Sequence, residues 1–325
     1  MNPQAVSVRL CIALVASTLI VACAGSPTSS SLPESNVAPT TRVVRNAART
    51  PLVYVASQNS STGAVYAFNP NGDTKPLETI VAGIAEPMGI ALDTTGTLYV
   101  ANSANSTVTA YAAGTTSPKR TLSAGISAPQ GVAVGSDGTV YVASEGSNPS
   151  AGTGTVTEYP SGTNTPSATL SLPGYDAFAT ALDASNDLYV SWFSTSDYAI
   201  KIYRYAPGST QGSDLKFDLT PGSFPAYGLT FDKSGDLLLA YENLTHGPPK
   251  YIGVFPPGAK KPSRKIQEAG LLDIVMGMAF NPQNSRLYVA AINDNDWMKL
   301  TYPRITPRCL VVVEQPTGLA YWPGR

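Results

Sequence analysis

The stretch PMGIALDTTGTLYVAN, residues 87–102, consists of an apolar run, a polar turn and a second apolar run. The second run is rich in aromatic and β-branched residues, which favour strands, and the turn carries Asp and Gly, which suit tight hairpins. The stretch therefore predicts a β-hairpin. The same pattern recurs along most of the chain, so its copies indicate the fold.

The first half of this hairpin, the phrase P-x-G-aliphatic-Ala, occurs in six complete or degraded copies. They are Pro87–Ala91, Pro129–Ala133, Ala177–Ala181, Ala226–Thr230, Val275–Ala279 and Pro316–Ala320. The second half, aliphatic-Tyr-Val-Ala, also has six copies: Val53–Ala56, Leu98–Ala101, Val140–Ala143, Leu188–Ser191, Leu237–Ala240 and Leu287–Ala290. The glycine position of the first phrase recurs every 41 to 49 residues. A period of about 40 to 50 residues built from short strands is typical of propeller blades.

Each repeat contains two further strand signals. A third strand such as TVTAY (107–111) leads into a turn of the form Tyr-x-x-Gly, and a short fourth strand such as RTL (120–122) ends the unit. The small residues of the first phrase suit an innermost strand, where the strands of all blades converge and leave little room for bulky side chains. The sequence therefore predicts an all-β fold, a six-bladed β-propeller of four-stranded antiparallel blades.

The two ends of the repeat region complement each other. The first unit begins at Val53–Ala56 and lacks its own first-phrase strand, whereas the chain ends just after a surplus one, Pro316–Tyr321. Pairing of these two strands would close the ring and remove the open edges through which sheets aggregate. We therefore expect the C-terminal strand to pair within the first blade and to complete six blades.

The pattern PxGIAxDxxGxLYVANxxxxxVTAY resembles the NHL-type propeller repeat and, more loosely, the senescence-marker/gluconolactonase superfamily. The resemblance covers roughly residues 51–325. It implies the propeller architecture, whereas a shared fold does not by itself imply a shared function. The likeness to gluconolactonase-like enzymes also implies a metal at the channel mouth, which those enzymes hold with Glu, Asn and Asp.

Composition narrows the possible partners. Of the 325 residues, 43% are hydrophobic, which is enough for a sizeable core, and only 13% are charged. The formal net charge is −1, so the chain lacks the basic footprint of a nucleic-acid-binding protein. The sequence therefore predicts no nucleic-acid partner.

The N-terminus has the features of a signal peptide, predicted here for residues 1–22. Arg9 provides a positive charge before a 13-residue apolar run, which is too short to remain as a membrane-spanning helix. The tetrapeptide Ile20–Cys23 resembles the lipobox of bacterial lipoproteins, which implies acylation of Cys23 and cleavage before it. The alternative is an ordinary secretory signal with an incidental cysteine.

The segment that follows predicts how the protein is placed in the cell. Residues 23–50 hold Ser, Thr, Pro and Ala with little apolar content, so they are predicted to form a disordered tether behind the lipidated Cys23. Two or three acyl chains give stable membrane anchoring. Ala24 stands where an Asp would resemble an inner-membrane retention signal, which favours the outer membrane or cell surface. Residues 51–325 are predicted to be the propeller.

Loops on one face of the propeller are the candidates for ligand binding. The loops between second and third strands, and those entering each first strand, share one face, here called the top face; binding residues often lie on such loops. The notable side chains there are Trp192, Phe193, Tyr241, Glu242, His246 and Trp297. Aromatic and amide-rich surfaces suit a sugar, a peptide or a partner protein. The alternative is that the aromatic rings pack between blades as core.

Three carboxylates in the loops entering alternate blades are candidate metal ligands. They are Glu86, Asp176 and Asp273, each three or four residues before the glycine position of its blade. Carboxylate oxygens at the mouth of one channel could bind Ca²⁺. The alternative is that they are solvated loop residues. His246 is the only histidine, and no nucleophile motif accompanies it, which argues against a Ser-His-Asp system.

The sequence thus favours a lipid-anchored, extracytoplasmic propeller that acts as a binding or scaffold module, without turnover and without a cofactor. Its ligand would be a protein, a glycan or a cell-wall component on the top face. The alternative is a metal-dependent, gluconolactonase-like hydrolase with a divalent cation at the channel mouth. A passive structural lipoprotein is a third possibility.

Overall fold

The computed structural model describes residues 51–58, 63–71, 75–219, 225–242, 250–267, 274–291, 296–303 and 307–324, without the side chains at 242, 250, 296 and 307–312. The chain divides into two units, 1–43 and 44–325, and every described residue belongs to the second. Within the described part, no helix is long and apolar enough to cross a membrane. The regular secondary structure of the second unit, within the described residues, is β-strand apart from one short 3₁₀ helix.

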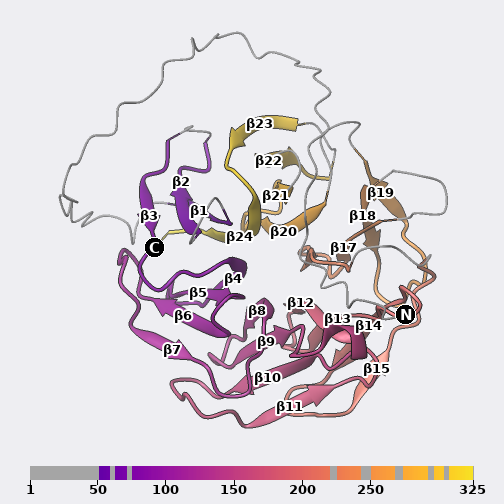
Figure 1. The fold of residues 1–325 in the computed structure, drawn as a ribbon. Helices are drawn as coiled ribbons and strands as arrows, with labels where there is room; N and C mark the ends of the chain where they lie inside the picture. Colours follow the sequence, from indigo (N-terminus) through magenta and orange to yellow (C-terminus); the bar gives the residue numbers. More distant parts are fainter. Residues whose placement is uncertain are drawn as a thin grey trace, which may run out of the picture. The chain divides into compact units, whose positions relative to one another are not determined.

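The strands form six four-stranded antiparallel sheets, which makes the fold a six-bladed β-propeller, as predicted (Figure 1). Blade one joins the C-terminal strand to the first three strands: β24 (Pro316–Trp322), β1 (Leu52–Ser57), β2 (Ala64–Phe68) and β3 (Glu78–Ile80). Blade two is β4 (Pro87–Leu92), β5 (Leu98–Asn102), β6 (Thr107–Tyr111) and β7 (Arg120–Leu122). Blade three is β8 (Pro129–Val134), β9 (Val140–Ser144), β10 (Thr155–Tyr159) and β11 (Ala168–Ser171), with the short 3₁₀ helix η1 (Pro149–Ala151) between β9 and β10.

The remaining blades also consist of four consecutive strands. Blade four is β12 (Asp176–Leu182), β13 (Leu188–Phe193), β14 (Ile200–Tyr205) and β15 (Gly212–Asp214). Blade five is β16 (Leu229–Phe231), β17 (Leu237–Glu242), β18 (Lys250–Phe255) and β19 (Arg264–Ile266). Blade six is β20 (Val275–Phe280), β21 (Arg286–Ala291), β22 (Asp296–Thr301) and β23 (Pro307–Val312).

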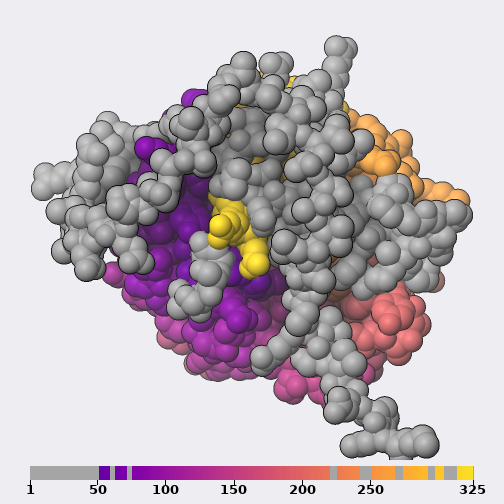
Figure 2. Space-filling model, turned by 45° about the horizontal axis from the view of Figure 1, so that its top comes forward, coloured from indigo at the N-terminus to yellow at the C-terminus, as the bar shows by residue number. Residues whose placement is uncertain are grey.

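The ring closes as the repeat count predicts. β24 pairs antiparallel with β1, in a register that sets Leu52 opposite Trp322 and Val55 opposite Leu319. In the space-filling view, yellow atoms of the C-terminal segment lie beside the indigo surface of blade one (Figure 2). Both ends of the propeller sequence therefore share one sheet, so blade one forms only when the whole chain has been assembled.

The innermost strands approach each other through their backbones. A Cβ atom on Gly131 of β8 would lie 2.4 Å from the carbonyl oxygen of Phe178 in β12, and one on Gly318 would lie 2.3 Å from that of Met88. Such separations are too short for any side chain. This explains why the repeated phrase carries Gly: the position abuts the next blade's main chain.

Blade five departs from this pattern. Its inner strand β16 is only three residues long and begins after Gly228, so the phrase Ala226–Thr230 is only partly a strand. A Cβ on Gly228 would meet side-chain atoms, at 3.0 Å from the Cβ of Ala240 and 3.1 Å from the Cε of Met278. The inner strand here is therefore less crowded by backbone than in blades two and three.

The hairpin turns between first and second strands have the structural role predicted for their acidic residues. In blade two, Oδ1 of Asp93 accepts hydrogen bonds from the backbone N–H groups of Thr95 (2.8 Å) and Thr97 (2.9 Å). Asp183 and Asp232 do the same in blades four and five. These carboxylates replace backbone partners in the turn, which is a structural role.

Candidate functional site

The aromatic residues predicted for the top face are core residues. The exposed fractions are 0% for Trp192 and Trp297, 4% for Phe193 and 6% for Tyr241. The ring of Trp297 lies 5.6 Å from that of Phe68 in blade one, measured between centroids. These four rings therefore pack within and between blades, as the alternative interpretation proposed, and they do not form a ligand-facing surface.

Several other predicted residues cannot be placed. The side chain of Glu242 and the whole of His246, Asp273 and Cys23 lie outside the described residues. The signal peptide and tether lie outside them as well. Their proposed roles remain predictions from the sequence.

A ring of six side chains marks the top end of the channel. It comprises the residue at the second position of each first phrase, and we call it the channel ring: Met88, Gln130, Phe178, Tyr227, Met276 and Thr317. Five of these side chains are at most 8% exposed, and Tyr227 is partly buried. Because each occupies the equivalent position of its repeat, and the repeats are arranged in a ring, the six lie around one axis.

Contacts across the channel ring join blades that are not neighbours. Met88 of blade two and Met276 of blade six form one apolar cluster, against which Tyr227 of blade five packs. The ring of Tyr227 also meets Phe178 of blade four edge-on, with the centroids 5.3 Å apart. The inner strands β4, β8, β12, β20 and β24 surround this point (Figure 1). These contacts bring apolar side chains of blades two, four, five and six together at the channel ring.

Polar groups occupy one side of the channel ring. Nε2 of Gln130 donates a hydrogen bond to Oε2 of Glu145, at 3.0 Å. Glu145 directly follows β9. Burial raises the pKa of Glu145, and the hydrogen bond from Gln130 opposes that rise. The charge of Glu145 adds to the effect of burial in raising the pKa of Tyr227.

Asp176 lies in the same region and is fully buried. Its Oδ1 accepts a hydrogen bond from the backbone N–H of Gly154 at 2.9 Å, whereas Oδ2 is buried without a partner among the described residues. Burial raises the pKa of Asp176 to about 7; the charge of Glu145 adds to this rise, and the Gly154 N–H opposes it. The carboxyl group is therefore partly protonated near neutral pH.

The described residues do not bring together a metal site. Glu86 is exposed and has a left-handed backbone, with φ of +47°. The groups that act on the Asp176 carboxyl are the backbone of Gly154 and Thr153 and the charge of Glu145. No group of three His, Cys, Asp or Glu side chains able to hold a metal occurs in the part of the chain that the structure describes. The described donors therefore do not fit a Ca²⁺ ion, which prefers six to eight oxygen ligands.

Sequence reasoning missed Gln130, Glu145 and the channel ring. The signal was present, because aligning the six first phrases places one variable residue immediately before the glycine position in each blade. A position that varies between Met, Gln, Phe, Tyr and Thr beside a position that is Gly or Ala in every repeat is a place where blades differ in chemistry. The proximity of Glu145 to Gln130 could not be read in this way, since it depends on how β9 ends.

Comparisons with known proteins agree with the architecture. No protein-family model and no curated protein sequence match the chain. Solved structures do match: a Kuenenia stuttgartiensis hydrazine synthase has a TM-score of 0.60 and 13% identity over 82% of this chain and 87% of that chain. A chain of a nidogen/laminin complex has a TM-score of 0.60 and 13% identity, over 83% and 98% of the two chains.

The periplasmic gluconolactonase PpgL of Pseudomonas aeruginosa is also similar, with a TM-score of 0.59 and 14% identity over 85% of this chain and 99% of that chain. The resemblance of the repeat to NHL-type and gluconolactonase-like propellers is therefore confirmed at the level of fold. At these identities, the likeness shows the fold alone.

Proposed function

We propose that this protein is a binding module of the bacterial cell envelope, anchored by lipid at Cys23, that holds a protein, glycan or cell-wall ligand on its top face without turnover. The observation that carries the proposal is the top end of the channel. There, apolar members of the channel ring pack against one another, and Gln130 of the ring donates to Glu145. Ligand sites typically combine apolar side chains with a few fixed polar groups, and the top end of the channel has this composition.

Photo-crosslinking in living cells would test this function. A benzophenone amino acid is introduced at Glu86, which is exposed on the top face, or at Ser161, which is exposed at a turn on the opposite face of blade three. We expect a discrete covalent adduct from position 86 and none from position 161. Glu145→Gln should weaken the adduct from position 86 if the channel end takes part in binding. Absence of an adduct at position 86, or equal adducts at both positions, would contradict the proposal.

The lipid anchor can be tested separately. Wild-type cells fed labelled palmitate should incorporate label into the chain, and Cys23→Ser should abolish incorporation and release the protein from membranes. Label retained in Cys23→Ser would mean that the cysteine is incidental and that the signal is an ordinary secretory one.

One observation favours the metal-dependent lactonase as a second candidate, namely the buried Oδ2 of Asp176 without a described partner. Hydrolysis of glucono-1,5-lactone with and without CaCl₂ distinguishes the two functions. Turnover that requires Ca²⁺ and is lost in Asp176→Asn would replace the binding proposal by the enzymatic one. A thermal shift with Ca²⁺ would support it, because a ligand that binds only the native state raises Tm.

A further inference from the structure

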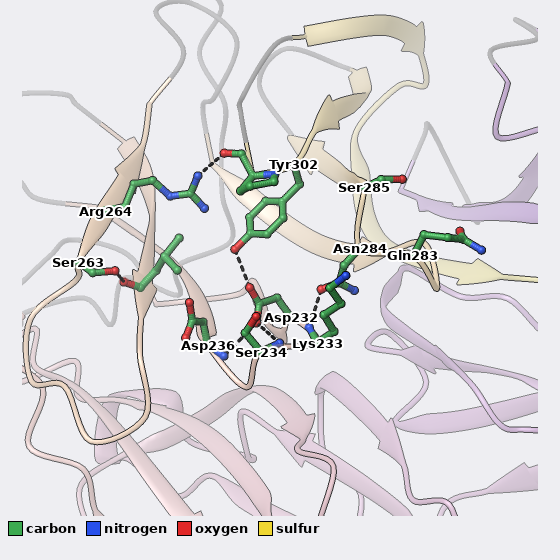
Figure 3. Close-up of a pocket in the computed structure, with 12 residues that line it drawn as sticks. Asp232, Lys233, Ser234, Asp236, Ser263, Arg264, Gln283, Asn284, Ser285 and Tyr302 are labelled. Atoms are coloured by element: carbon green, nitrogen blue, oxygen red, sulfur yellow. Dashed lines mark hydrogen bonds between the residues drawn. The ribbon is translucent and has the colours of Figure 1, made fainter.

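A groove opens between blades five and six on the face opposite the top face, here called the turn face because it carries the first-to-second-strand hairpins. Its volume is about 590 Å³, which falls within the range of about 300–1,000 Å³ usual for small-molecule sites. The Asp232–Asp236 turn forms one wall, and Tyr302 of blade six forms another (Figure 3). The Tyr302 hydroxyl donates to Oδ2 of Asp232 at 2.8 Å, so the two blades are joined beneath the groove.

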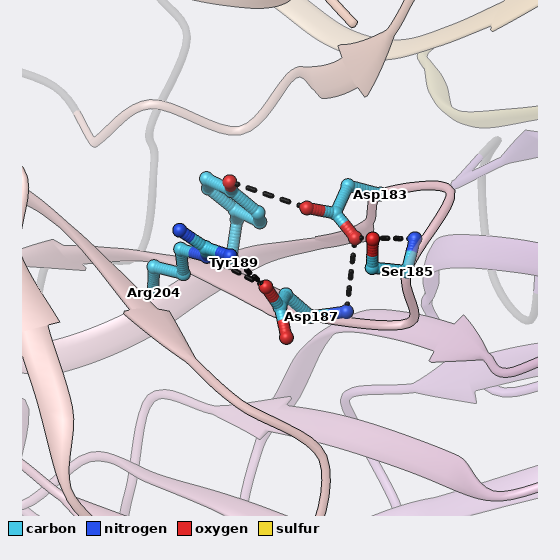
Figure 4. A network of polar contacts seen from close by, with 5 residues as sticks. All are labelled: Asp183, Ser185, Asp187, Tyr189 and Arg204. Carbon is cyan, nitrogen blue, oxygen red and sulfur yellow. Dashed lines mark hydrogen bonds and ion pairs between the residues drawn. The ribbon is translucent and has the colours of Figure 1, made fainter. Parts of the chain in front are cut away.

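Blade four shows how the same position is filled elsewhere in the chain. There, Asp187 ends the hairpin turn and is paired with Arg204, which lies opposite Tyr189 in the adjacent strand (Figure 4). In blade five the equivalent turn residue is Asp236, and the strand residue at the position of Arg204 is Val254, opposite Leu238. The cation that would neutralise the carboxylate is therefore replaced by a small apolar side chain.

The Asp236 side chain consequently forms no hydrogen bond or ion pair within the described residues. Blade two again differs, because Thr97 at this position accepts a hydrogen bond from Nζ of Lys119 at 2.9 Å. Asp236 is only partly exposed. Burial and the charge of Asp232 raise its pKa, and the charge of Arg264 opposes that rise. A partly desolvated carboxylate without a donor is an acceptor available to an external group.

Arg264 provides donors on another wall of the groove. Its guanidinium lies over the ring of Tyr302, 5.0 Å from the centroid, and donates to the carbonyl oxygen of Pro303. It has five N–H donors in total, and it makes no ion pair with Asp236. The charged residues that line the groove are two acids, Asp232 and Asp236, and two bases, Lys233 and Arg264. Their charges cancel, so the groove favours neither a cation nor an anion as a whole.

We propose that this groove binds a neutral saccharide. A sugar hydroxyl both donates and accepts hydrogen bonds, so neighbouring hydroxyls can donate to the carboxylate of Asp236 and accept from the guanidinium of Arg264. Both are charge-assisted interactions of the stronger kind. Serine hydroxyls and the amide of Gln283 line the rest of the groove. The site is on the turn face, so it is independent of the ligand proposed for the top face.

The test uses the mature chain and three neutral disaccharides as probes: maltose, cellobiose and N,N′-diacetylchitobiose. Binding is measured by saturation-transfer NMR and calorimetry. Ser263 is exposed at the rim, and its hydroxyl donates to the carbonyl of Val254. Ser263→Trp should therefore block the groove without disturbing the fold. Its matched control is Ser167→Trp, because Ser167 makes the equivalent hydrogen bond in blade three.

We expect at least one disaccharide to bind saturably, and we expect Ser263→Trp and Asp236→Asn each to weaken that binding about tenfold or more. Ser167→Trp should leave the affinity unchanged. The proposal is overturned if none of the three probes binds at concentrations up to tens of millimolar, or if binding survives Ser263→Trp. It is also overturned if N-acetyl-arginine amide binds in a manner sensitive to Ser263→Trp while the saccharides do not, since the groove would then be a cation site that repeats the pairing of Arg204 with Asp187.

Discussion

At the scale of single residues, glycine is needed for two different reasons: lack of space where blades meet, and backbone conformation in the exposed turns. Gly131 and Gly318 lie against the backbone of the following blade, whereas Gly162 and Gly208 have open space around a Cβ position. The second pair has positive φ values of 76° and 71°, which explains their glycines by conformation rather than by space. The same residue type therefore has two physical roles in one repeat.

The backbone contacts predict that adding a methyl group lowers the free energy of unfolding by different amounts at different inner-strand glycines. Gly131→Ala should lower the free energy of unfolding by about 1–3 kcal/mol, because the main chain of blade four cannot move aside easily. Gly228→Ala should cost less, since its nearest neighbours include the flexible end of Met278. Denaturant titrations of both variants measure the difference, and an equal cost would mean that inner-strand crowding does not limit this position.

The buried carboxyl group of Asp176 predicts a pH dependence of stability. Its pKa is about 7 in the folded protein, whereas an unfolded Asp titrates near its ordinary value of about 3.9. Between these values the folded state binds more protons than the unfolded state, so the contribution of Asp176 to stability falls as pH rises.

Asp176→Asn removes that titration, and the amide oxygen can still accept from Gly154. The free energy of unfolding of the variant, minus that of the wild type, should therefore increase from about pH 4 to about pH 7, by at most about 1.4 kcal/mol per pH unit. Above that range the difference should level off. Unfolding curves collected at matched ionic strength test this. A difference that does not change with pH would show that the Asp176 carboxyl has the same pKa in the folded and unfolded states.

At the scale of elements, the hairpin turns of neighbouring blades are connected by asparagine side chains. Asn186 in the turn of blade four accepts a hydrogen bond from the backbone N–H of Ser136 at 3.0 Å and donates to its hydroxyl at 2.7 Å. Asn284 of blade six likewise accepts a hydrogen bond from the backbone N–H of Lys233 in blade five. Both asparagines have positive φ, 62° and 53°, so one residue type supplies the turn conformation and the link between blades.

This double role predicts that two substitutions at Asn186 lower the free energy of unfolding by different amounts. Asn186→Gly keeps the turn conformation and loses the link to Ser136, whereas Asn186→Ala loses the link and also strains the backbone. We expect Asn186→Ala to lower the free energy of unfolding by about 1–3 kcal/mol and Asn186→Gly to lower it by less. Thermal melting ranks the two, and equal stability of both variants would argue that the turn tolerates ordinary residues.

At the scale of the whole molecule, closure of the ring depends on the last strand. β24 supplies the innermost strand of blade one, and Trp322 at its end packs against Gly96 in the turn of blade two. Deletion of Pro316–Arg325 should therefore abolish cooperative unfolding, because β1 would keep β2 but lose its inner partner β24 and the ring would stay open. The control deletion, Pro323–Arg325, lies beyond β24 and should melt like the full chain. A cooperative melt of the longer truncation would show that closure is not needed for folding.

The repeat predicted the fold correctly because its signals are local. Turn residues such as Asp93 and Gly96, and the aromatic and aliphatic residues between them, specify hairpins whatever surrounds them. Counting two phrases six times each gave the number of blades, and the surplus phrase at the C-terminus gave the closure. Trp192 and Trp297 show the limit of this reasoning, because a loop-adjacent tryptophan looks the same in the sequence whether it faces solvent or a neighbouring blade.

The sequence by itself determined the number of blades, the strands of each blade and the strand pair that closes the ring, because these follow from short-range patterns repeated in register. Only the tertiary structure decided which polar groups are buried, that Glu145 lies within reach of Gln130, and where the seam between blades five and six leaves Asp236 without a donor. Those properties depend on which side chains meet once the strands of a blade and the neighbouring blades pack, and such contacts leave no period in the sequence.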